Sequence, residues 1–476
     1  MSGNFDRKLY KNLFTIGSYN YGYTLFQFFA SMVLSRLLTP VEYGIVALIT
    51  VFTGFISFFK DAGLSYLVIR EDYRNRFYRA IQMVSLVIGL GLAFLICILA
   101  YPISLFYQES SLIFPTLVMG LVLVIESLAI VPTALLKKRL QFRELGRINF
   151  LVYVSGSILT IILAFLQFSY WALIIGQVYS TLFLLLLIQR KAGLKFNFIK
   201  ASNFTIGFRK ARSILFNVSG SRLIHYWADN TDNLVIGKAF GVAKLGIYNR
   251  AFQLLTMQLN LVSGVFNTVL FPSLKQVSKN NGNFEKEYRT ALGGMSLVIL
   301  PIMIILVHFS TPTIKLIWGI EWMEVAEITP FFGVLSVTYI LSRTFGSIYI
   351  LYHSENLLFR IGIMSTIITV SMVLLGMQFS ISTIAFMISM GFVALILPIT
   401  LYIAFIRNFK FPIAFLIEFW LIKIIGSLFS LIGLYFDIPE LVYTGTFILV
   451  TQTLFQEYHQ LLSFWNFVRA KLGFEK

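Results

Sequence analysis

The sequence predicts an all-α polytopic membrane protein with about fourteen transmembrane helices, in two pseudo-symmetric lobes of six helices plus two C-terminal helices. Of its 476 residues, 58% are hydrophobic and 12% are charged, whereas about a quarter of a soluble domain is charged. Apolar runs long enough to cross the roughly 30 Å hydrocarbon layer recur along most of the chain. The two halves of the sequence also share a short repeat. A water-exposed globular domain is therefore excluded.

Apolar runs separated by polar residues predict the helices in chain order. The first run follows Arg7, Lys8 and Lys11, as in a signal peptide, but no small-residue cleavage site follows it, so we expect a retained span. The seventh and eighth runs are the most polar, so twelve or thirteen helices remain alternatives. The predicted spans lie near residues 14–37, 42–60, 80–106, 112–135, 148–167, 170–188, 213–237, 245–271, 291–317, 326–351, 358–377, 381–405, 412–435 and 439–459.

Lysine and arginine are distributed unevenly between the connectors. Counted from a cytoplasmic N-terminus, 29 of the 38 Lys and Arg residues fall in the termini and connectors of that side. Opposite connectors, such as residues 107–112, 166–171 and 376–382, contain none. The positive-inside rule therefore places both termini in the cytoplasm and the chain in the cytoplasmic (inner) membrane. Membrane topology also accounts for the net charge of +17 better than a nucleic-acid partner does.

Motifs for catalysis, metals or cofactors are missing from the sequence. The four histidines are scattered, the lone Cys97 has no partner in the chain, and no phosphate-binding G-x-x-x-x-G-K-[ST] motif is present. The longest connector, about residues 189–212, leaves no room for an extramembrane catalytic domain. We therefore predict a protein that is not an enzyme and has neither a cofactor nor a metal site.

The internal repeat relates residues 33–45 to residues 235–247. A displacement of 202 residues places Arg36 on Lys238 and Gly44 on Gly246. In each copy a helix is expected to end, and after a short turn the next helix begins with a glycine close to its start.

This displacement also predicts the domain organisation. Six spans fit before residue 205 and six more before about residue 410. We expect an N-terminal lobe at 1–205, a C-terminal lobe at 206–410, and two additional helices with a cytoplasmic tail at 411–476. Repeated lobes in transporters commonly enclose a binding site at their interface.

A polar stripe runs along the predicted seventh span. It contains Arg222, His225, Asp229, Asp232 and Asn233, whose spacing places them on one helical face. An ionised side chain at the bilayer centre costs at least about 2.5 to 3.5 kcal/mol, so we expect the stripe to face a protein interior or a water-filled cavity. A structural ion-pair network that only holds helices together is the alternative.

The first span repeats this stripe in neutral form. At the same displacement Asn20 corresponds to Arg222, and Gln27 corresponds to Asp229. Two polar faces at equivalent places predict a shared central cavity, to which Arg250 and Arg343 could contribute. Other intramembrane charges stand nearly alone, and for these we favour local pairing or snorkelling over function; they are Glu126, Glu418 and Lys423.

Five segments together resemble a known family. They are Leu34-Ser-Arg-Leu-Leu-Thr-Pro-Val-Glu-Tyr-Gly-Ile-Val-Ala-Leu48, Phe59-Lys-Asp-Ala-Gly-Leu64, Lys137-Lys-Arg-Leu-Gln-Phe-Arg143, Asp232-Asn-Leu-Val-Ile-Gly237 and Leu245-Gly-Ile-Tyr248. In order and spacing they are similar to the polysaccharide transporter family, which includes Wzx-type flippases, of the multidrug/oligosaccharidyl-lipid/polysaccharide (MOP) flippase superfamily. The resemblance covers most of the chain up to about residue 410.

The resemblance implies a MATE-like fold, a central cavity open alternately to either side, and a polyprenyl-pyrophosphate-linked oligosaccharide as cargo. It also implies membrane lipids, a polysaccharide polymerase and a chain-length regulator as partners. A cationic cavity is typical of the family, and the candidate basic residues here are Arg36, Arg222, Lys238, Arg250 and Arg343, with Asn20 and Gln27 as polar neighbours. This chain departs from that pattern through Asp229 and Asp232, which with His225 become candidates for H⁺ or Na⁺ coupling.

Two other functions remain open. A MATE-like, cation-coupled antiporter of small organic molecules would favour a cavity dominated by carboxylates and aromatic rings, and Arg222 argues against it. A membrane polysaccharide polymerase or glycosyltransferase would need a sizeable outer loop, and the predicted outer connectors are short.

Overall fold

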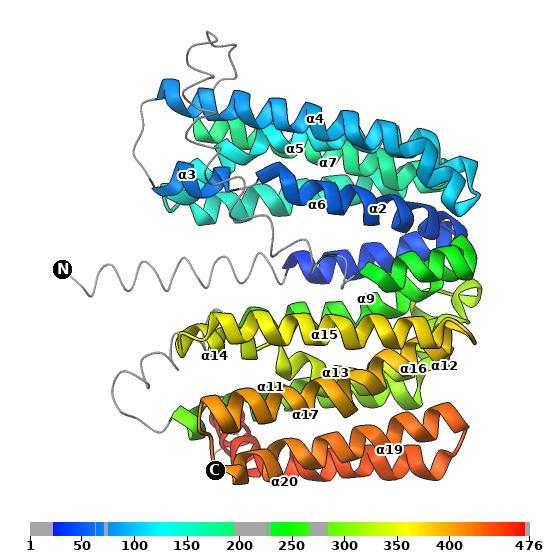
Figure 1. Cartoon of the computed structure of the whole chain (residues 1–476), viewed down its shortest axis with the longest axis vertical. Helices are drawn as coiled ribbons and strands as arrows, with labels where there is room; N and C mark the ends of the chain where they lie inside the picture. The colour runs from blue at the N-terminus through cyan, green and yellow to red at the C-terminus, as the bar shows by residue number, and fades with distance from the viewer. Residues whose placement is uncertain are drawn as a thin grey trace, which may run out of the picture. The chain divides into compact units, whose positions relative to one another are not determined.

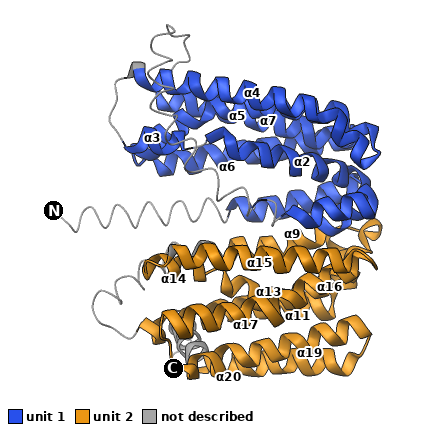
Figure 2. Ribbon diagram, in the orientation of Figure 1, with its two compact units in different colours: residues 1–249 blue, residues 250–476 orange. Residues whose placement is uncertain are grey.

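The structure, a computed structural model, describes residues 22–61, 63–70, 75–194, 226, 230–265 and 284–471. Within these ranges every regular element is a helix. The chain forms two compact units, residues 1–249 and 250–476 (Figure 2). The lobe boundaries expected near residues 205 and 410 stay a prediction.

Unit 1 contains helices at the first six predicted spans, the first of which the structure describes only from residue 22. Helical residues 22–37 are followed by α2, and further along the chain residues 230–239 are followed by the start of α9 (Figure 1). The elements are α2 (Pro40–Asp61), α3 (Leu64–Arg70), α4 (Asn75–Tyr107), η1 (Ser110–Leu112), α5 (Ile113–Lys138), α6 (Phe142–Phe165), α7 (Trp171–Ala192) and α9 (Gly241–Val265), which continues into unit 2.

Unit 2 divides several predicted spans into shorter helices. The predicted helix 291–317 is interrupted at Phe309, and the predicted helix 326–351 is interrupted at Arg343. The elements are α11 (Phe284–His308), α12 (Ser310–Ile317), η3 (Ile320–Trp322), α13 (Val325–Ser342), α14 (Phe345–Leu351), α15 (Glu355–Gly376), α16 (Ile381–Gly391), η4 (Phe392–Ile396), α17 (Leu397–Thr400), η5 (Leu401–Asn408), α18 (Ile413–Phe415), η6 (Leu416–Leu421), α19 (Ile422–Phe436) and α20 (Pro439–Lys471), where η4, η5 and η6 are π-helical.

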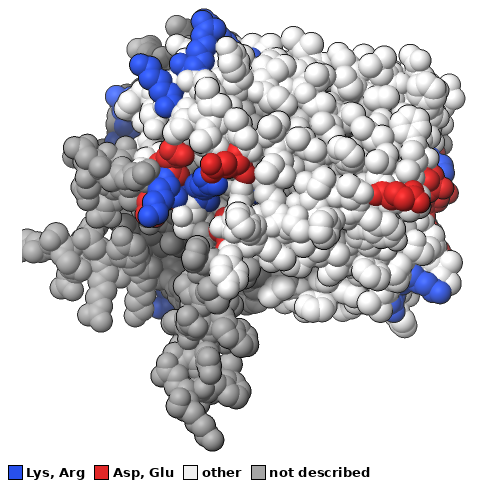
Figure 3. All heavy atoms as spheres, turned by 90° about the horizontal axis from the view of Figure 1, so that it is seen from below, with Lys and Arg blue, Asp and Glu red and all other residues white. Residues whose placement is uncertain are grey.

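The described residues contain 10 helical segments that are long and apolar enough to cross a membrane. On the face of the molecule drawn in Figure 3, charged side chains gather toward the two ends and an uncharged surface lies between them. The prediction of a multi-pass membrane protein is therefore confirmed. The count of fourteen helices stays a prediction, because the seventh and eighth predicted spans lie partly outside the described ranges.

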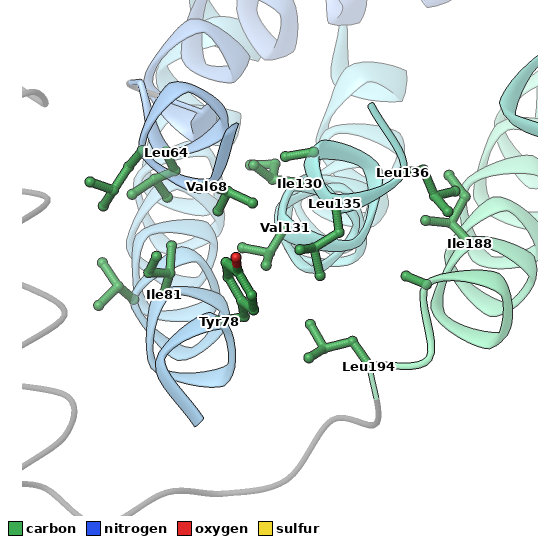
Figure 4. Packing of buried hydrophobic residues seen from close by; sticks show 14 of the residues in the cluster. Leu64, Val68, Tyr78, Ile81, Ile130, Val131, Leu135, Leu136, Ile188 and Leu194 are labelled. Atoms are coloured by element: carbon green, nitrogen blue, oxygen red, sulfur yellow. The ribbon is translucent and has the colours of Figure 1, made fainter. Parts of the chain in front are cut away.

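A large apolar cluster among the described residues of unit 1 joins five helices, α3 to α7. Leu64 and Val68 of α3 and Tyr78 of α4 pack against Val131 of α5, and Ile188 of α7 lies in the same buried cluster (Figure 4). These side chains recur three or four residues apart along their helices, so each helix presents one continuous apolar face to its neighbours. Ile148 and Val152 of α6 belong to the same cluster, which therefore packs α3, α4, α5, α6 and α7 against one another.

The two copies of the internal repeat contact each other inside unit 1. A Cβ added to Gly44 of α2 would collide with the carbonyl group of Val242, and a Cβ added to Gly246 of α9 would collide with the carbonyl group of Pro40. Pro40 and Val242 are themselves related by the displacement of 202 residues. The contact is thus reciprocal, as a pseudo-twofold relation between the two helix starts requires. Small residues of this kind allow membrane helices to approach backbone to backbone.

Candidate functional site

The predicted polar stripe is only partly described by the structure. Asn20, Arg222, His225 and Asp229 lie outside the described residues, so their placement stays a prediction. The other candidate residues are described and fall into two groups: Asp232 and Arg250 are buried, whereas Gln27, Arg36, Lys238 and Arg343 are exposed.

Asp232 lies in the interior of unit 1. Its side chain is 8% exposed. The Tyr248 hydroxyl of α9 donates a hydrogen bond to Asp232 Oδ2 over 2.7 Å, and the backbone N–H of Asn233 donates to Asp232 Oδ1 over 2.8 Å. Hydrogen bonds of this kind stabilise a buried carboxylate. The burial agrees with the expectation that the stripe faces protein and not lipid.

Arg250 is held among aromatic rings in unit 2. It is 4% exposed, and its Nη1 donates to Gln253 Oε1 over 2.5 Å. The guanidinium carbon lies 5.4 Å from the ring centroid of Trp318 and 5.2 Å from that of Trp322. Two indole rings can stabilise a desolvated guanidinium by about 2 kcal/mol or more through cation–π attraction. In this structure Arg250 is therefore enclosed by side chains of its own unit.

The exposed basic candidates lie close to helix ends. Arg36 comes just before the end of helical residues 22–37, and Arg343 separates α13 from α14. Lys238 Nζ donates to the Phe106 carbonyl and lies 4.8 Å from the Phe106 ring centroid. Long basic side chains at the ends of spans commonly reach toward the membrane surface.

Unit 1 also contains an ion pair near the middle of its spans. Lys60 Nζ of α2 lies 2.6 Å from Glu126 Oε2 of α5, and the two side chains are 22% and 27% exposed. Glu126 lies 12 residues before the end of the span Ser110–Lys138, and Lys60 lies 10 residues before the end of the span Pro40–Arg70. Glu126 therefore sits roughly 18 Å from the nearer end of its span, and Lys60, in the last turn of α2, contacts it at that depth. The expected local pairing of Glu126 is confirmed.

Two tyrosines extend this pair into a larger group. Glu126 is close enough to Tyr153 of α6 to act on its phenol electrostatically. The Tyr153 ring in turn lies 4.2 Å, centroid to centroid, from the ring of Tyr23. We call Lys60, Glu126, Tyr153 and Tyr23 the central polar cluster. It provides a cation, a carboxylate and two phenols at membrane depth, where ionisable residues usually face a wet interior and serve function.

Tyr226 connects the seventh predicted span with the helix that carries Lys60. The Tyr226 hydroxyl donates to the carbonyl of Val51 in α2. Its ring lies 5.7 Å from the ring of Phe55 and 5.0 Å from the ring of Phe58. The stripe-bearing span therefore contacts α2 at Tyr226. Sequence reasoning did not single out Lys60, because it lies at the end of the predicted span 42–60, next to Asp61, where a charged residue is ordinary.

Comparisons with known proteins agree with the fold and with the resemblance. The sequence matches the family described as polysaccharide biosynthesis protein over residues 33–327. It is 23% identical over 334 residues to the teichuronic acid biosynthesis protein TuaB of Bacillus subtilis (strain 168), covering 68% of this chain and 67% of TuaB.

Two solved structures show the same fold. The lipid II flippase MurJ, in an inward closed conformation, matches with a TM-score of 0.66 and 14% identity over 94% of this chain and 99% of MurJ. A multidrug resistance MATE family transporter of the MOP superfamily, in an inward-facing conformation, matches with a TM-score of 0.55 and 14% identity over 88% of this chain and 95% of the transporter. The expected MATE-like fold is confirmed by these matches.

Proposed function

The chain belongs to the polysaccharide biosynthesis protein family, and from this premise we propose that it is a flippase for an undecaprenyl-pyrophosphate-linked oligosaccharide. The proposed cargo is the repeat unit of a surface polysaccharide such as an O-antigen, a capsule, an exopolysaccharide or a teichuronic acid. Two observations together support the proposal. The chain belongs to this family, and its fold matches that of a lipid II flippase over nearly the whole chain. A protein of this class is a transporter and not an enzyme.

The chemistry of such a cargo explains why charges occur inside the membrane helices. The polyprenyl tail can stay in the lipid, so only the pyrophosphate and the sugars need shelter. A guanidinium binds a phosphate through two parallel hydrogen bonds, and in a low-dielectric interior these replace lost hydration. Arg222 of the stripe and Lys60 of the central polar cluster are the residues that we propose for this role.

Transport would proceed by alternating access, in which the polar site opens first to one side of the membrane and then to the other. The proposed location is the cytoplasmic membrane with both termini in the cytoplasm, which the distribution of Lys and Arg supports. A polymerase and a chain-length regulator, acting on the product at the outer surface, are the proposed protein partners.

The first prediction concerns Arg222. In a strain whose own copy of the gene is deleted, Arg222→Ala is expected to reduce surface polysaccharide to the level of the deletion, because the cargo's pyrophosphate loses its main ligand. Asp229→Asn should weaken transport if a cation is coupled there. Surface polysaccharide is measured at matched amounts of membrane-inserted protein.

Lys315→Ala provides the control for Arg222→Ala, because Lys315 is an exposed basic residue in the short helix α12. This control should retain normal polysaccharide. Normal polysaccharide in the Arg222 and Asp229 variants as well would remove the stripe from the mechanism.

A further inference from the structure

A lysine is completely buried near the middle of a span in unit 2. Lys423 is 0% exposed and lies 10 residues after the start of the span Ile413–Phe436. Its Nζ donates to Gln456 Oε1 of α20 over 3.2 Å and lies 4.0 Å from the ring centroid of Phe419. Within the described residues no carboxylate lies within ion-pair distance of this ammonium. Such a residue is costly in a membrane and marks a functional site by default.

A buried carboxylate lies close to Lys423. Glu457 of α20 is 4% exposed, and its Oε2 has no hydrogen-bond partner among the described residues. A Cβ added to Gly293 would collide with this carboxylate, so Glu457 lies directly against the backbone of α11. Lys423 and Arg289 of α11 act on Glu457 electrostatically. An unsatisfied buried carboxylate oxygen needs an explanation, such as a proton or a water molecule.

The other helices packed on α19 bring no further charge to this pair. α16 has no charged residue, and Glu327 of α13 is exposed in the first turn of its helix. Glu418, in η6, forms an ion pair of 2.6 Å with Arg289. Arg289, which acts electrostatically on both Lys423 and Glu457, and its partner Glu418 are therefore the further charged groups beside this pair.

A polar file runs from this pair along the interface of α19 and α20. In α19 it continues from Lys423 to Ser427 and Ser430, and in α20 from Glu457 to Thr453 and Thr446. These spacings of three, four and seven residues place each set on one face of its helix. The hydroxyl oxygens of Ser427, Ser430 and Thr453 are buried and lack hydrogen-bond partners among the described residues. We call these six residues the polar file.

The file reaches toward both ends of unit 2. At one end the Arg289–Glu418 pair is partly exposed, with side chains 32% and 55% exposed. At the other end Thr446 Oγ1 lies 3.1 Å from Nε2 of His308, the last residue of α11. Neighbours three or four residues apart on a helix are about 5 to 6 Å apart, a gap that one water molecule can bridge by two hydrogen bonds. Thr453 and Thr446 are seven residues apart, and there the file continues through Ser430 of α19, whose hydroxyl lies against Gly445, the residue before Thr446.

The backbone just before Lys423 departs from the α-helix, and this departure helps to hold α20 against α19. Residues Leu416–Leu421 form a π-helical turn immediately before α19. The carbonyl of Glu418 accepts hydrogen bonds from Gln452 and Gln456 of α20, and the carbonyl of Phe419 accepts one from Gln452 over 3.0 Å. π-helical turns occur frequently at functional sites. Here the turn frees carbonyls that fix α20, and with it Glu457, beside Lys423.

We propose that α19 and α20 form a proton pathway through unit 2, in which the Lys423–Glu457 pair binds and releases the proton. Before binding, Lys423 is an ammonium and Glu457 a carboxylate. The arriving proton forms one O–H bond with Glu457, and on release this bond breaks and the proton passes to the next water or hydroxyl of the file. The buried pair thereby changes its net charge by one. The coupling of this step to lipid transport rests on the proposed function.

The first experiment measures coupling in sealed vesicles that contain the purified full-length protein and a fluorescent undecaprenyl-pyrophosphate-linked oligosaccharide. With the membrane potential held at zero, a gradient of one pH unit should shift the ratio of lipid between the two leaflets about tenfold if one proton moves per lipid. Glu457→Gln should abolish this shift. Glu440→Gln, which changes an exposed glutamate of the same helix, should keep it.

A shift in the Glu457→Gln variant equal to that of the wild type would overturn the proposal. So would a wild-type protein that moves the lipid without any response to the gradient, and in that case the proposed function would stand. If the wild-type protein moves no lipid at all, the proposed function fails instead, and proton binding is then decided by the second experiment.

The second experiment detects the proton without any transport. Infrared difference spectra of the protein in lipid, recorded during a pH titration, should show the C=O stretch of a protonated carboxylic acid that is lost in Glu457→Gln and kept in Glu440→Gln. Spectra that are identical for wild type and Glu457→Gln at every pH would overturn the proposal. If Glu457→Gln does not yield folded protein, Glu457→Asp replaces it, and this variant should shift the band because the carboxyl group moves.

Discussion

Gly246→Ala is expected to remove most of the folded protein from the membrane. The new methyl group would meet the carbonyl oxygen of Pro40 and, at 3.1 Å, the backbone nitrogen of Gly44. Both obstacles are backbone atoms of α2 that cannot rotate away, so α9 would have to separate from α2. Overpacking of this kind costs about 1 to 3 kcal/mol or more. The yield of monodisperse protein and its melting temperature in detergent measure the effect.

Two further variants make this prediction specific. Gly44→Ala should be as harmful as Gly246→Ala, because its Cβ would collide with the carbonyl group of Val242 in the reciprocal contact. Gly91→Ala is the matched control, since no atom lies within 4 Å of an added Cβ in α4. Alanine should stabilise that helix by up to about 1 kcal/mol. Equal folded yields for Gly246→Ala and Gly91→Ala would show that the reciprocal contact does not exist.

The second large effect is expected at the central polar cluster. Lys60→Met should leave Glu126 without its partner, and Glu126→Gln should leave Lys60 without its partner. A partly buried ion left unpaired destabilises a protein by up to about 3 to 5 kcal/mol. Both single variants should therefore lose surface polysaccharide and melt at lower temperature. The double variant should recover the melting temperature but not the polysaccharide, because Lys60 is proposed to bind the cargo.

An exposed ion pair of the same unit serves as the control. Lys191 and Glu144 lie 3.1 Å apart with side chains 43% and 36% exposed. Such surface pairs contribute at most about 1 kcal/mol to stability. Lys191→Met should therefore change neither the surface polysaccharide nor the melting temperature by much. Recovery of polysaccharide as well as stability in the Lys60→Met/Glu126→Gln double variant would assign the central pair a purely structural role.

Hydropathy predicted where helices occur but not where they break. Each apolar run of about 20 residues must satisfy its own backbone hydrogen bonds in lipid, so a helix is its expected structure. The breaks at Phe309 and Arg343 lie between segments that are apolar on both sides, and hydropathy gives no signal for them. Similarly, α20 continues to Lys471, beyond the predicted end at residue 459, because helix formation does not require continuous hydrophobicity.

The sequence predicted some of the charged residues that are buried, but it did not predict which residues they pair with. The cost of a buried charge singled out Asp232 within the stripe, whereas Arg250 was a candidate for the cavity wall; the structure buries both, and their role in a site stays a prediction. The partners of Glu126 and Glu418 lie 66 and 129 residues away along the chain, and such distant pairs depend on helix packing that one sequence does not reveal. Lys423 was expected to be locally paired or to snorkel; the structure buries it completely and gives its Nζ a hydrogen bond to Gln456 Oε1 of α20.

The most direct measurement of the central claim is transport by the purified protein itself. Vesicles with and without the protein are loaded with a fluorescent undecaprenyl-pyrophosphate-linked oligosaccharide, and a membrane-impermeant reductant is then added to quench the label that faces outward. We expect label from the inner leaflet to become accessible in vesicles with the wild-type protein and to stay protected in vesicles with Arg222→Ala. Protection of the inner-leaflet label in vesicles that contain folded wild-type protein would contradict it.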